Sequence, residues 1–308
     1  MGKTAWIFPG QGSQYVGMGR ELCERFAEAR IVFDQAEQSL GKDLRRIIFD
    51  GPEDTLKQTV YAQPAIFVVS VALIKVMEQM GLSPDYVAGH SLGEYSALVA
   101  AGAITFEDAL ALVSARATAM QRACEANGGA MCAVLGFDAQ TLEEICAGVS
   151  DGVVDVANIN SPGQVVISGE RNAVKTAGDE AMRRGARRVI PLQVSGAFHS
   201  RLMRSAADEF EPYAMKTPLA APAISFFPNV TASLTDDPAQ IRNKLVEQIY
   251  NPVRWQLTVE RMLEEGVATF IEVGPGKVLT GLLKRTNGST VGLNVDGPDS
   301  VEALAQKS

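Results

Sequence analysis

The pentapeptide Gly89-His90-Ser91-Leu92-Gly93 is the feature that most constrains how this chain can fold. A short apolar stretch, 86–88, precedes it, and an apolar run, 92–101, follows it. A G-x-S-x-G pattern between a strand and a helix is typical of a nucleophile elbow, in which the turn is so sharp that the neighbours of the serine must be small. The alternative is an ordinary strand–turn–helix with an incidental serine. The flanking elements favour the elbow, with Ser91 presented at the end of a strand.

Strands and helices alternate along both ends of the chain. The sequence predicts strands at 4–8, 86–88, 224–227 and 268–273, and helices at 65–80, 92–101, 106–123, 202–214, 239–250 and 255–265. Such alternation is typical of an α/β fold whose mostly parallel sheet is covered by helices on both faces. The last dozen residues are expected to form a surface tail.

The pattern changes between Asn127-Gly128-Gly129 and Pro191. Here the sequence predicts strands at 130–135, 153–159, 164–168 and 187–192, and helices at 139–147 and 170–184. The order β-α-β-β-α-β is that of the ferredoxin-like unit. We therefore expect two domains, a body formed by 1–126 and 196–308 and a ferredoxin-like domain, 127–195, inserted into it.

Charge and cysteine content exclude several classes of function. The chain carries 28 basic and 36 acidic residues, a net charge of −8, so nucleic-acid binding is not expected. The four cysteines form no CxxC pair and the two histidines lie in unrelated segments, so no metal site is expected. We see no signal peptide and no stretch of about 20 apolar residues that would span a membrane. These features predict a cytoplasmic protein without a membrane partner.

A serine nucleophile needs a base, and the chain has only His90 and His199 to offer. His90 adjoins the serine and is expected to point elsewhere, which leaves His199. A lone histidine is more often structural, but the elbow requires a base. We expect the reaction to slow at acid pH as His199 protonates. The sequence does not identify an acidic residue that would orient the histidine as the third member of a catalytic triad. A main-chain carbonyl is able to accept the Nδ1 hydrogen bond instead.

An oxyanion hole and an anion clamp complete the predicted site. The N–H of Leu92 is one candidate donor, and the turn 10–14 offers a second. The alternative for that turn, a phosphate loop, lacks the Gly-Lys-Ser/Thr ending. Arg116 shares a helix face with Leu112 and Met120, and a guanidinium on an apolar face needs an anion. That anion is either a structural carboxylate or the carboxylate of a substrate.

Taken together, these residues make the chain resemble the malonyl-CoA:acyl-carrier-protein transacylases of fatty-acid and polyketide synthesis, over nearly its whole length. The matching segments are 8–14, 63–65, 89–97, 160–164, 248–252 and 272–279. The resemblance implies an α/β-hydrolase-like body with a ferredoxin-like insertion. It also implies ping-pong transfer of a malonyl group from malonyl-CoA to the phosphopantetheine thiol of acyl carrier protein, through a malonyl-serine intermediate and without a cofactor.

The resemblance assigns the catalytic roles residue by residue. Ser91 would be the nucleophile and His199 its base. The backbone carbonyl of Gln248 would orient the histidine and so supply the missing third member. The main-chain N–H groups of Gln11 and Leu92 would form the oxyanion hole.

The resemblance also implies a set of substrate-binding residues. Arg116 would bind the malonyl carboxylate, and Asn160 and Gln63 would lie at the substrate. Many bacterial members have Pro-Ser before the histidine, whereas this chain has Ala197-Phe198. A bulky Phe198 would crowd an α-methyl branch, which favours malonyl over methylmalonyl groups and leaves the pathway, fatty-acid or polyketide, open.

Two other functions use the same residues. The first is an acyl-CoA hydrolase, and the second is an inactive carrier-binding subunit. For the transacylase, the resemblance suggests a monomer whose partners are malonyl-CoA and acyl carrier protein. Carrier proteins are typically acidic, so we expect a basic docking patch, for which the candidates are Arg183, Arg184, Arg187 and Arg188, or Lys284 and Arg285.

Overall fold

Strand β1 (Lys3–Phe8) lies in the middle of a five-stranded sheet because both of its faces are apolar. Ala5 and Ile7 pack against one layer of helices, and Trp6 and Phe8 pack against the other. A strand buried on both faces is typical of a parallel sheet, and every pairing in this sheet is parallel. The computed structural model, which describes residues 2–194 and 196–306, thus confirms the predicted α/β class.

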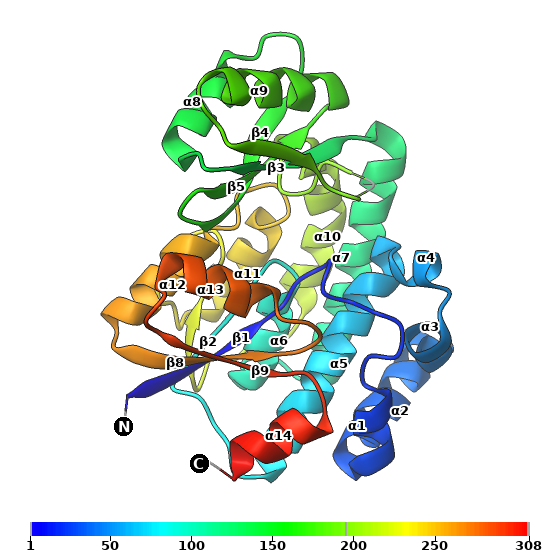
Figure 1. The fold of residues 1–308 in the computed structure, drawn as a ribbon. Helices are drawn as coiled ribbons and strands as arrows, with labels where there is room; N and C mark the ends of the chain where they lie inside the picture. The colour runs from blue at the N-terminus through cyan, green and yellow to red at the C-terminus, as the bar shows by residue number, and fades with distance from the viewer. Residues whose placement is uncertain (1, 195, 307–308) are drawn as a thin grey trace.

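The strand order of the large sheet is β7-β2-β1-β8-β9 (Figure 1). The other strands are β2 (Tyr86–Gly89), β7 (Ser225–Phe227), β8 (Val267–Val273) and β9 (Val291–Val295). One face is covered by α12 (Trp255–Glu264) and α13 (Val278–Thr286). The opposite face is covered by α5 (Thr59–Gln79) and α6 (Gly93–Ala100), outside which pack α7 (Phe106–Asn127), α10 (Arg204–Lys216) and α11 (Pro238–Glu247).

One expectation about the C-terminal segment is wrong, and one helix is apolar enough to need comment. The described part of the last dozen residues, 297–306, is not a surface tail, because α14 (Pro298–Ala305) packs against α5 and buries Val301. Helix α5 is long and apolar enough, by length and composition alone, to cross a membrane, but 83% of its most apolar window is buried inside the protein. It is therefore a core helix. No element is predicted from the sequence between residues 20 and 56. The structure has four helices there, namely α1 (Arg20–Arg25), α2 (Ala27–Leu40), α3 (Leu44–Asp50) and α4 (Glu53–Leu56).

The smaller part of the molecule has the β-α-β-β-α-β order that the sequence predicts. Its elements are β3 (Ala130–Leu135), α8 (Ala139–Gly148), β4 (Val154–Ser161), β5 (Gln164–Gly169), α9 (Arg171–Arg183) and β6 (Arg188–Pro191). The sheet is antiparallel with the order β4-β5-β3-β6, and both helices cover one face of it (Figure 1). We propose the domain boundaries at 126/127 and 195/196 on this arrangement, although Ser195 itself lies outside the described residues.

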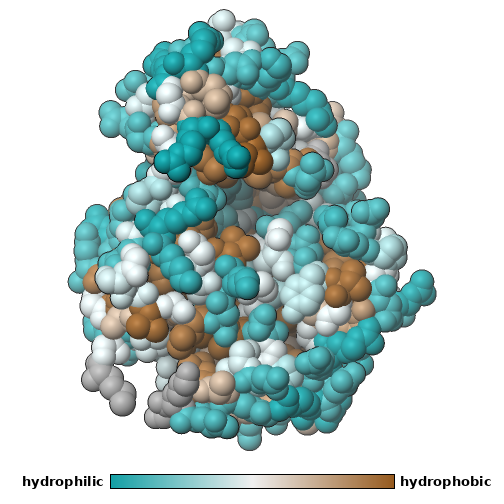
Figure 2. All heavy atoms as spheres, in the orientation of Figure 1, coloured by the Kyte–Doolittle hydropathy of each residue, from teal (hydrophilic) through white to brown (hydrophobic). Residues whose placement is uncertain are grey.

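Main-chain pairing fixes the small part to the body. The N–H of Ile159 donates to the carbonyl of Val253 at 2.9 Å, and the N–H of Val253 donates to the carbonyl of Ala157 at 2.9 Å. An ion pair of 2.5 Å between Arg201 and Asp155 adds a second link. Figure 2 shows a hollow between the two parts, and the candidate site lies there.

Close backbone packing at the elbow predicts a strong effect of one added methyl group. A Cβ on Gly93 would lie 2.1 Å from the carbonyl oxygen of Phe8. We therefore expect Gly93→Ala to lower the free energy of unfolding by about 3 kcal/mol, measured by urea denaturation. In the control Gly281→Ala, in the interior of α13, a Cβ meets nothing within 4 Å, so stability should rise by up to about 1 kcal/mol. Equal stabilities for the two variants would contradict the packing argument.

Candidate active site

Ser91 lies at the turn between β2 and α6 with a backbone φ of 51°. This left-handed conformation is uncommon for a residue with a side chain, and such residues cluster at functional sites. The turn is held on β1, because the N–H of His90 donates to the carbonyl of Phe8 at 2.9 Å. The strand and the helix that the sequence predicts on either side of Ser91 are both present.

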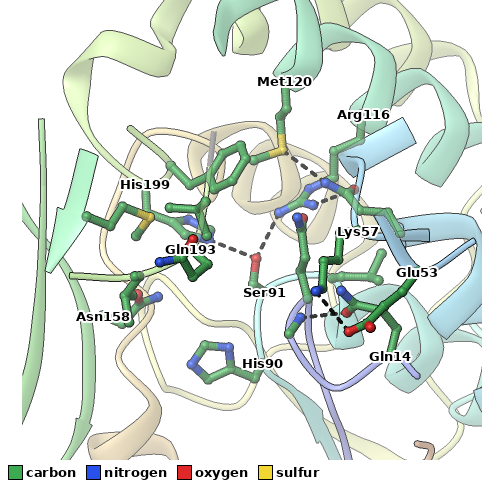
Figure 3. A pocket seen from close by; sticks show the side chains of 18 residues that line it. Gln14, Glu53, Lys57, His90, Ser91, Arg116, Met120, Asn158, Gln193 and His199 are labelled. Atoms are coloured by element: carbon green, nitrogen blue, oxygen red, sulfur yellow. Dashed lines mark hydrogen bonds and ion pairs between the residues drawn. The ribbon is translucent and has the colours of Figure 1, made fainter. Parts of the chain in front are cut away.

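The imidazole of His199 contacts the hydroxyl of Ser91. Its Nε2 lies 2.8 Å from Ser91 Oγ (Figure 3). Its Nδ1 lies 2.7 Å from the main-chain carbonyl oxygen of Gln248. A carbonyl oxygen only accepts, so Nδ1 carries the proton and Nε2 is left free to take one from Ser91. His199 also has a positive φ, 58°. The third group of this arrangement is therefore a carbonyl, one of the options that the residues alone left open.

Burial and a nearby positive charge keep His199 neutral. The imidazole is buried, and the Arg116 guanidinium adds to that effect, so that the pKa of His199 falls to about 3. Slowing of the reaction by protonation of His199 is therefore expected only as the pH approaches about 3. The base form of the ring is the main form throughout the neutral range.

Arg116 is buried, and its hydrogen bonds go only to neutral groups. Nη2 donates to Ser91 Oγ at 3.0 Å (Figure 3). Nη2 also donates to Gln248 Oε1 at 2.8 Å, and Nη1 donates to Gln63 Oε1 at 2.7 Å. No salt bridge among the described residues includes Arg116, although the buried carboxyl of Glu94 lies close enough to act on the guanidinium electrostatically. A guanidinium held beside the nucleophile in this way is able to bind an incoming anion.

A cavity of about 460 Å³ opens at Ser91 between the two parts of the molecule. Seven of the predicted site residues line it, namely Gln11, Gln63, Ser91, Leu92, Arg116, Phe198 and His199. Residues without a prediction also line it, among them Met120, Asn158 and Gln193 (Figure 3). Met131 and Val194 line it as well. Figure 3 shows that the side chains come from elements far apart in the sequence.

Asn160 is the predicted substrate contact that the structure does not bring to this cavity. Its Oδ1 lies 2.8 Å from Nε2 of His90, and it lines a separate cavity of about 170 Å³. His90 turns its Nε2 away from Ser91, as expected, and its ring meets the edge of Trp255. Asn158, two positions earlier in β4, lines the main cavity instead.

Both candidate oxyanion donors belong to residues that line the cavity at Ser91. Gln11 belongs to the turn after β1, and Leu92 precedes α6. Neither main-chain N–H donates to another group among the residues that the structure describes. Both are therefore available to an oxygen that becomes negative at the carbon bonded to Ser91.

Sequence reasoning missed two buried polar residues beneath the elbow, Glu94 and Asn229. Asn229 Oδ1 accepts the N–H of Ser91 at 2.7 Å. Burial raises the pKa of Glu94 to about 7, against the opposing effects of hydrogen bonds from Gln248 and Asn229 and of the Arg116 charge. A signal for each existed: Glu94 is an acid in the otherwise apolar helix α6, and Asn229 follows β7, the strand beside β2.

Comparison with known proteins gives one family along the chain. The acyl transferase domain family matches residues 5–303. The malonyl CoA-acyl carrier protein transacylase of Bacillus subtilis is 44% identical, over 99% of this chain and 97% of that protein. The protein of the same name from Escherichia coli strain K12 is 42% identical, over 99% of this chain and 100% of that protein.

Solved structures give the same result. An acyl carrier protein S-malonyltransferase from Vibrio cholerae has a TM-score of 0.95 and 45% identity, covering 98% of this chain and 99% of that one. A malonyl-transacylase solved with its type II polyketide acyl carrier protein, PlMCAT:AntF, has a TM-score of 0.96 and 40% identity, covering 99% of this chain and 100% of that one.

The neutral state of His199 predicts how reactivity at Ser91 depends on pH. We expect the rate of Ser91 modification by a fluorophosphonate to stay constant between pH 5 and pH 8, because a base with a pKa of about 3 is unprotonated throughout. Timed labelling followed by gel fluorescence measures this rate, and Ser91→Ala gives the background. A rate that falls tenfold per pH unit below about pH 6.5, the ordinary pKa of histidine, would contradict the effect of burial.

Proposed function

The chain belongs to the acyl transferase domain family, and we propose that Ser91 carries the acyl group in its reaction. The enzyme is a malonyl-CoA:acyl-carrier-protein transacylase, which transfers malonyl groups from malonyl-CoA to acyl carrier protein. One observation supports the residue assignment above all others: Ser91 Oγ lies 2.8 Å from Nε2 of a neutral histidine and 3.0 Å from Nη2 of a buried arginine. The proposed base and the proposed carboxylate-binding group therefore both contact the oxygen of the proposed nucleophile.

In the first half-reaction, Ser91 Oγ attacks the thioester carbonyl carbon of malonyl-CoA. His199 Nε2 takes the proton of the hydroxyl as the new C–O bond forms. The oxyanion of the tetrahedral intermediate accepts hydrogen bonds from the N–H groups of Gln11 and Leu92. The C–S bond then breaks, and the departing CoA thiolate takes the proton from His199, which leaves a malonyl-serine ester.

The second half-reaction runs the same steps with a different thiol. The phosphopantetheine thiol of acyl carrier protein gives its proton to His199 and attacks the ester carbonyl carbon. The C–O bond to Ser91 breaks, and Ser91 Oγ receives the proton from His199. The hydrogen bond from Nδ1 to the carbonyl of Gln248 keeps the imidazole oriented in both halves.

Selection of the malonyl group is assigned to Arg116. The carboxylate of a malonyl ester lies two carbons beyond the reacting carbonyl, and Arg116 is held beside Ser91 by Gln63 and Gln248. Bidentate binding of this carboxylate would give the buried guanidinium a charged partner. Phe198 lines the same cavity, and its bulk supports a preference for malonyl over α-methylated groups.

The enclosed position of the ester supports transfer over hydrolysis. Ser91, His199 and Arg116 lie in a cavity between the body and the small domain, where water is excluded more readily than at an open surface.

Arg187 and Arg188 line a second cavity of about 710 Å³, which shares Met131 and Leu192 with the first. We infer that the carrier approaches from this side, and that the enzyme acts as a cytoplasmic monomer.

Incubation with malonyl-CoA tests the covalent step. Without carrier protein, we expect one equivalent of CoA to be released per enzyme and Ser91 to gain one malonyl group, measured by intact-protein mass spectrometry. Added phosphopantetheinylated carrier should then remove the label. Ser91→Ala should give neither signal. Continuous release of CoA without carrier would favour the hydrolase, and no labelling of the wild type would favour an inactive carrier-binding subunit.

Loss of Arg116 should change acyl selectivity. We expect Arg116→Ala to raise the barrier for malonyl transfer by about 2–5 kcal/mol, because a buried charge-assisted pair is lost, and to affect acetyl transfer far less. The measurement is kcat/KM with malonyl-CoA and with acetyl-CoA. Arg122→Ala is the matched control, since Arg122 lies on the same helix but is exposed and pairs with Glu209. Equal losses with both acyl groups would remove Arg116 from carboxylate binding.

A further inference from the structure

Glu94 is a buried acid at the active site to which the reaction assigns no step. It lies in the first turn of α6, directly below the elbow, with no exposed surface. Its Oε2 accepts two hydrogen bonds, one from Nε2 of Gln248 at 2.7 Å and one from the main-chain N–H of Asn229 at 3.0 Å. Among the described residues its Oε1 has no hydrogen-bond partner.

The two groups that Glu94 holds are the same two that hold the main chain of Ser91. Asn229 Oδ1 accepts the N–H of Ser91 at 2.7 Å, and Gln248 Nε2 donates to the carbonyl of Ser91 at 2.9 Å. Asn229 Nδ2 also donates to the carbonyl of Gly89 at 2.6 Å. Because Ser91 has a φ of 51°, its unusual conformation depends on such contacts.

Gln248 extends this arrangement to the other two reacting groups. Its side-chain Oε1 accepts from Arg116 Nη2 at 2.8 Å, and its main-chain carbonyl accepts from His199 Nδ1 at 2.7 Å. Glu94 requires a donor from Gln248 and Arg116 requires an acceptor, so the two together fix which way the amide points. A displaced Gln248 would move the nucleophile, its base and the clamp together.

We propose that Glu94 is a positioning residue, whose Oε2 holds Asn229 and Gln248 and through them the geometry of Ser91, His199 and Arg116. This inference rests on the proposed function of those three residues. The proposal adds one specific requirement. Residue 94 must place a hydrogen-bond acceptor oxygen as far from the main chain as a glutamate side chain does.

The requirement concerns the oxygen and not the charge. Burial raises the pKa of Glu94 to about 7, so at neutral pH the protonated and ionised forms coexist. A proton on Oε1, which has no partner, leaves both hydrogen bonds to Oε2 in place. Arg116 on α7 is the charged group that acts on Glu94, Tyr95 is its titratable neighbour on α6, and His199 is neutral.

Three substitutions of Glu94 separate the effect of side-chain length from the effect of side-chain charge. Glu94→Gln keeps an acceptor at the same reach without the charge, and we expect single-turnover acylation by radiolabelled malonyl-CoA to stay within about threefold of the wild-type rate. Glu94→Asp keeps the charge but withdraws the oxygen by one methylene, and Glu94→Met has no acceptor. Both should acylate at least about tenfold more slowly, since misplacement of a reacting group by about 1 Å costs up to about a hundredfold.

A control pair distinguishes positioning from a purely structural role. Glu272 is equally buried, and it accepts hydrogen bonds from the N–H groups of Leu279 and Thr280 at the start of α13, with no contact to Ser91. We expect Glu272→Gln and Glu272→Asp to lower the melting temperature and to leave the acylation rate unchanged. Rates are normalised to the final amount of labelled Ser91, so that unfolded protein does not count.

Each outcome decides the proposal. It is supported if Glu94→Gln is fast and Glu94→Asp is slow, with acetyl groups slowed as well as malonyl groups, because Ser91 itself is misplaced. A wild-type rate in Glu94→Asp would overturn it, and so would a Glu94→Gln as slow as Glu94→Asp. If Glu94→Met does not fold, the other two variants still give the answer. Absence of malonyl-enzyme in the wild type would instead refute the proposed function.

Discussion

The hydroxyl of Ser91 lies between a neutral imidazole and a guanidinium, and the rest of the site depends on that contact. Nε2 of His199 is 2.8 Å away and Nη2 of Arg116 is 3.0 Å away. The guanidinium has two effects here. It offers a positive charge to an acyl group that carries a carboxylate, and it adds to the effect of burial, which lowers the pKa of His199 to about 3. The base therefore stays unprotonated beside a cation that the substrate needs.

This arrangement requires both parts of the fold. The parallel sheet places Ser91 at the end of β2, next to β1 and β7, and the turns after those strands supply Gln11 and Asn229. The small domain covers the site, because β4 pairs with the backbone at Val253 and brings Asn158 to the cavity. Segments that are distant in sequence thus line one cavity of about 460 Å³.

Features that depend on local pattern were predictable from the sequence. The elbow around Ser91 and the β-α-β-β-α-β order follow from glycine spacing and apolar periodicity, which are properties of adjacent residues. Features that depend on distant contacts were not. The burial of α14 depends on α5, the pKa of His199 depends on its burial and then on Arg116, and the hydrogen bond of Asn160 depends on His90. All of these contacts join residues that are distant in sequence. The link from Gln248 to the histidine came from family resemblance alone.

A crystal structure of the malonyl-enzyme tests the central claim most directly. The account predicts an ester on Ser91 whose carboxylate forms two hydrogen bonds to Arg116 and whose carbonyl oxygen lies within hydrogen-bond distance of the N–H groups of Gln11 and Leu92. His199 should still donate from Nδ1 to the carbonyl of Gln248. A malonyl carboxylate bound away from Arg116, or an acyl group attached to another residue, would contradict it.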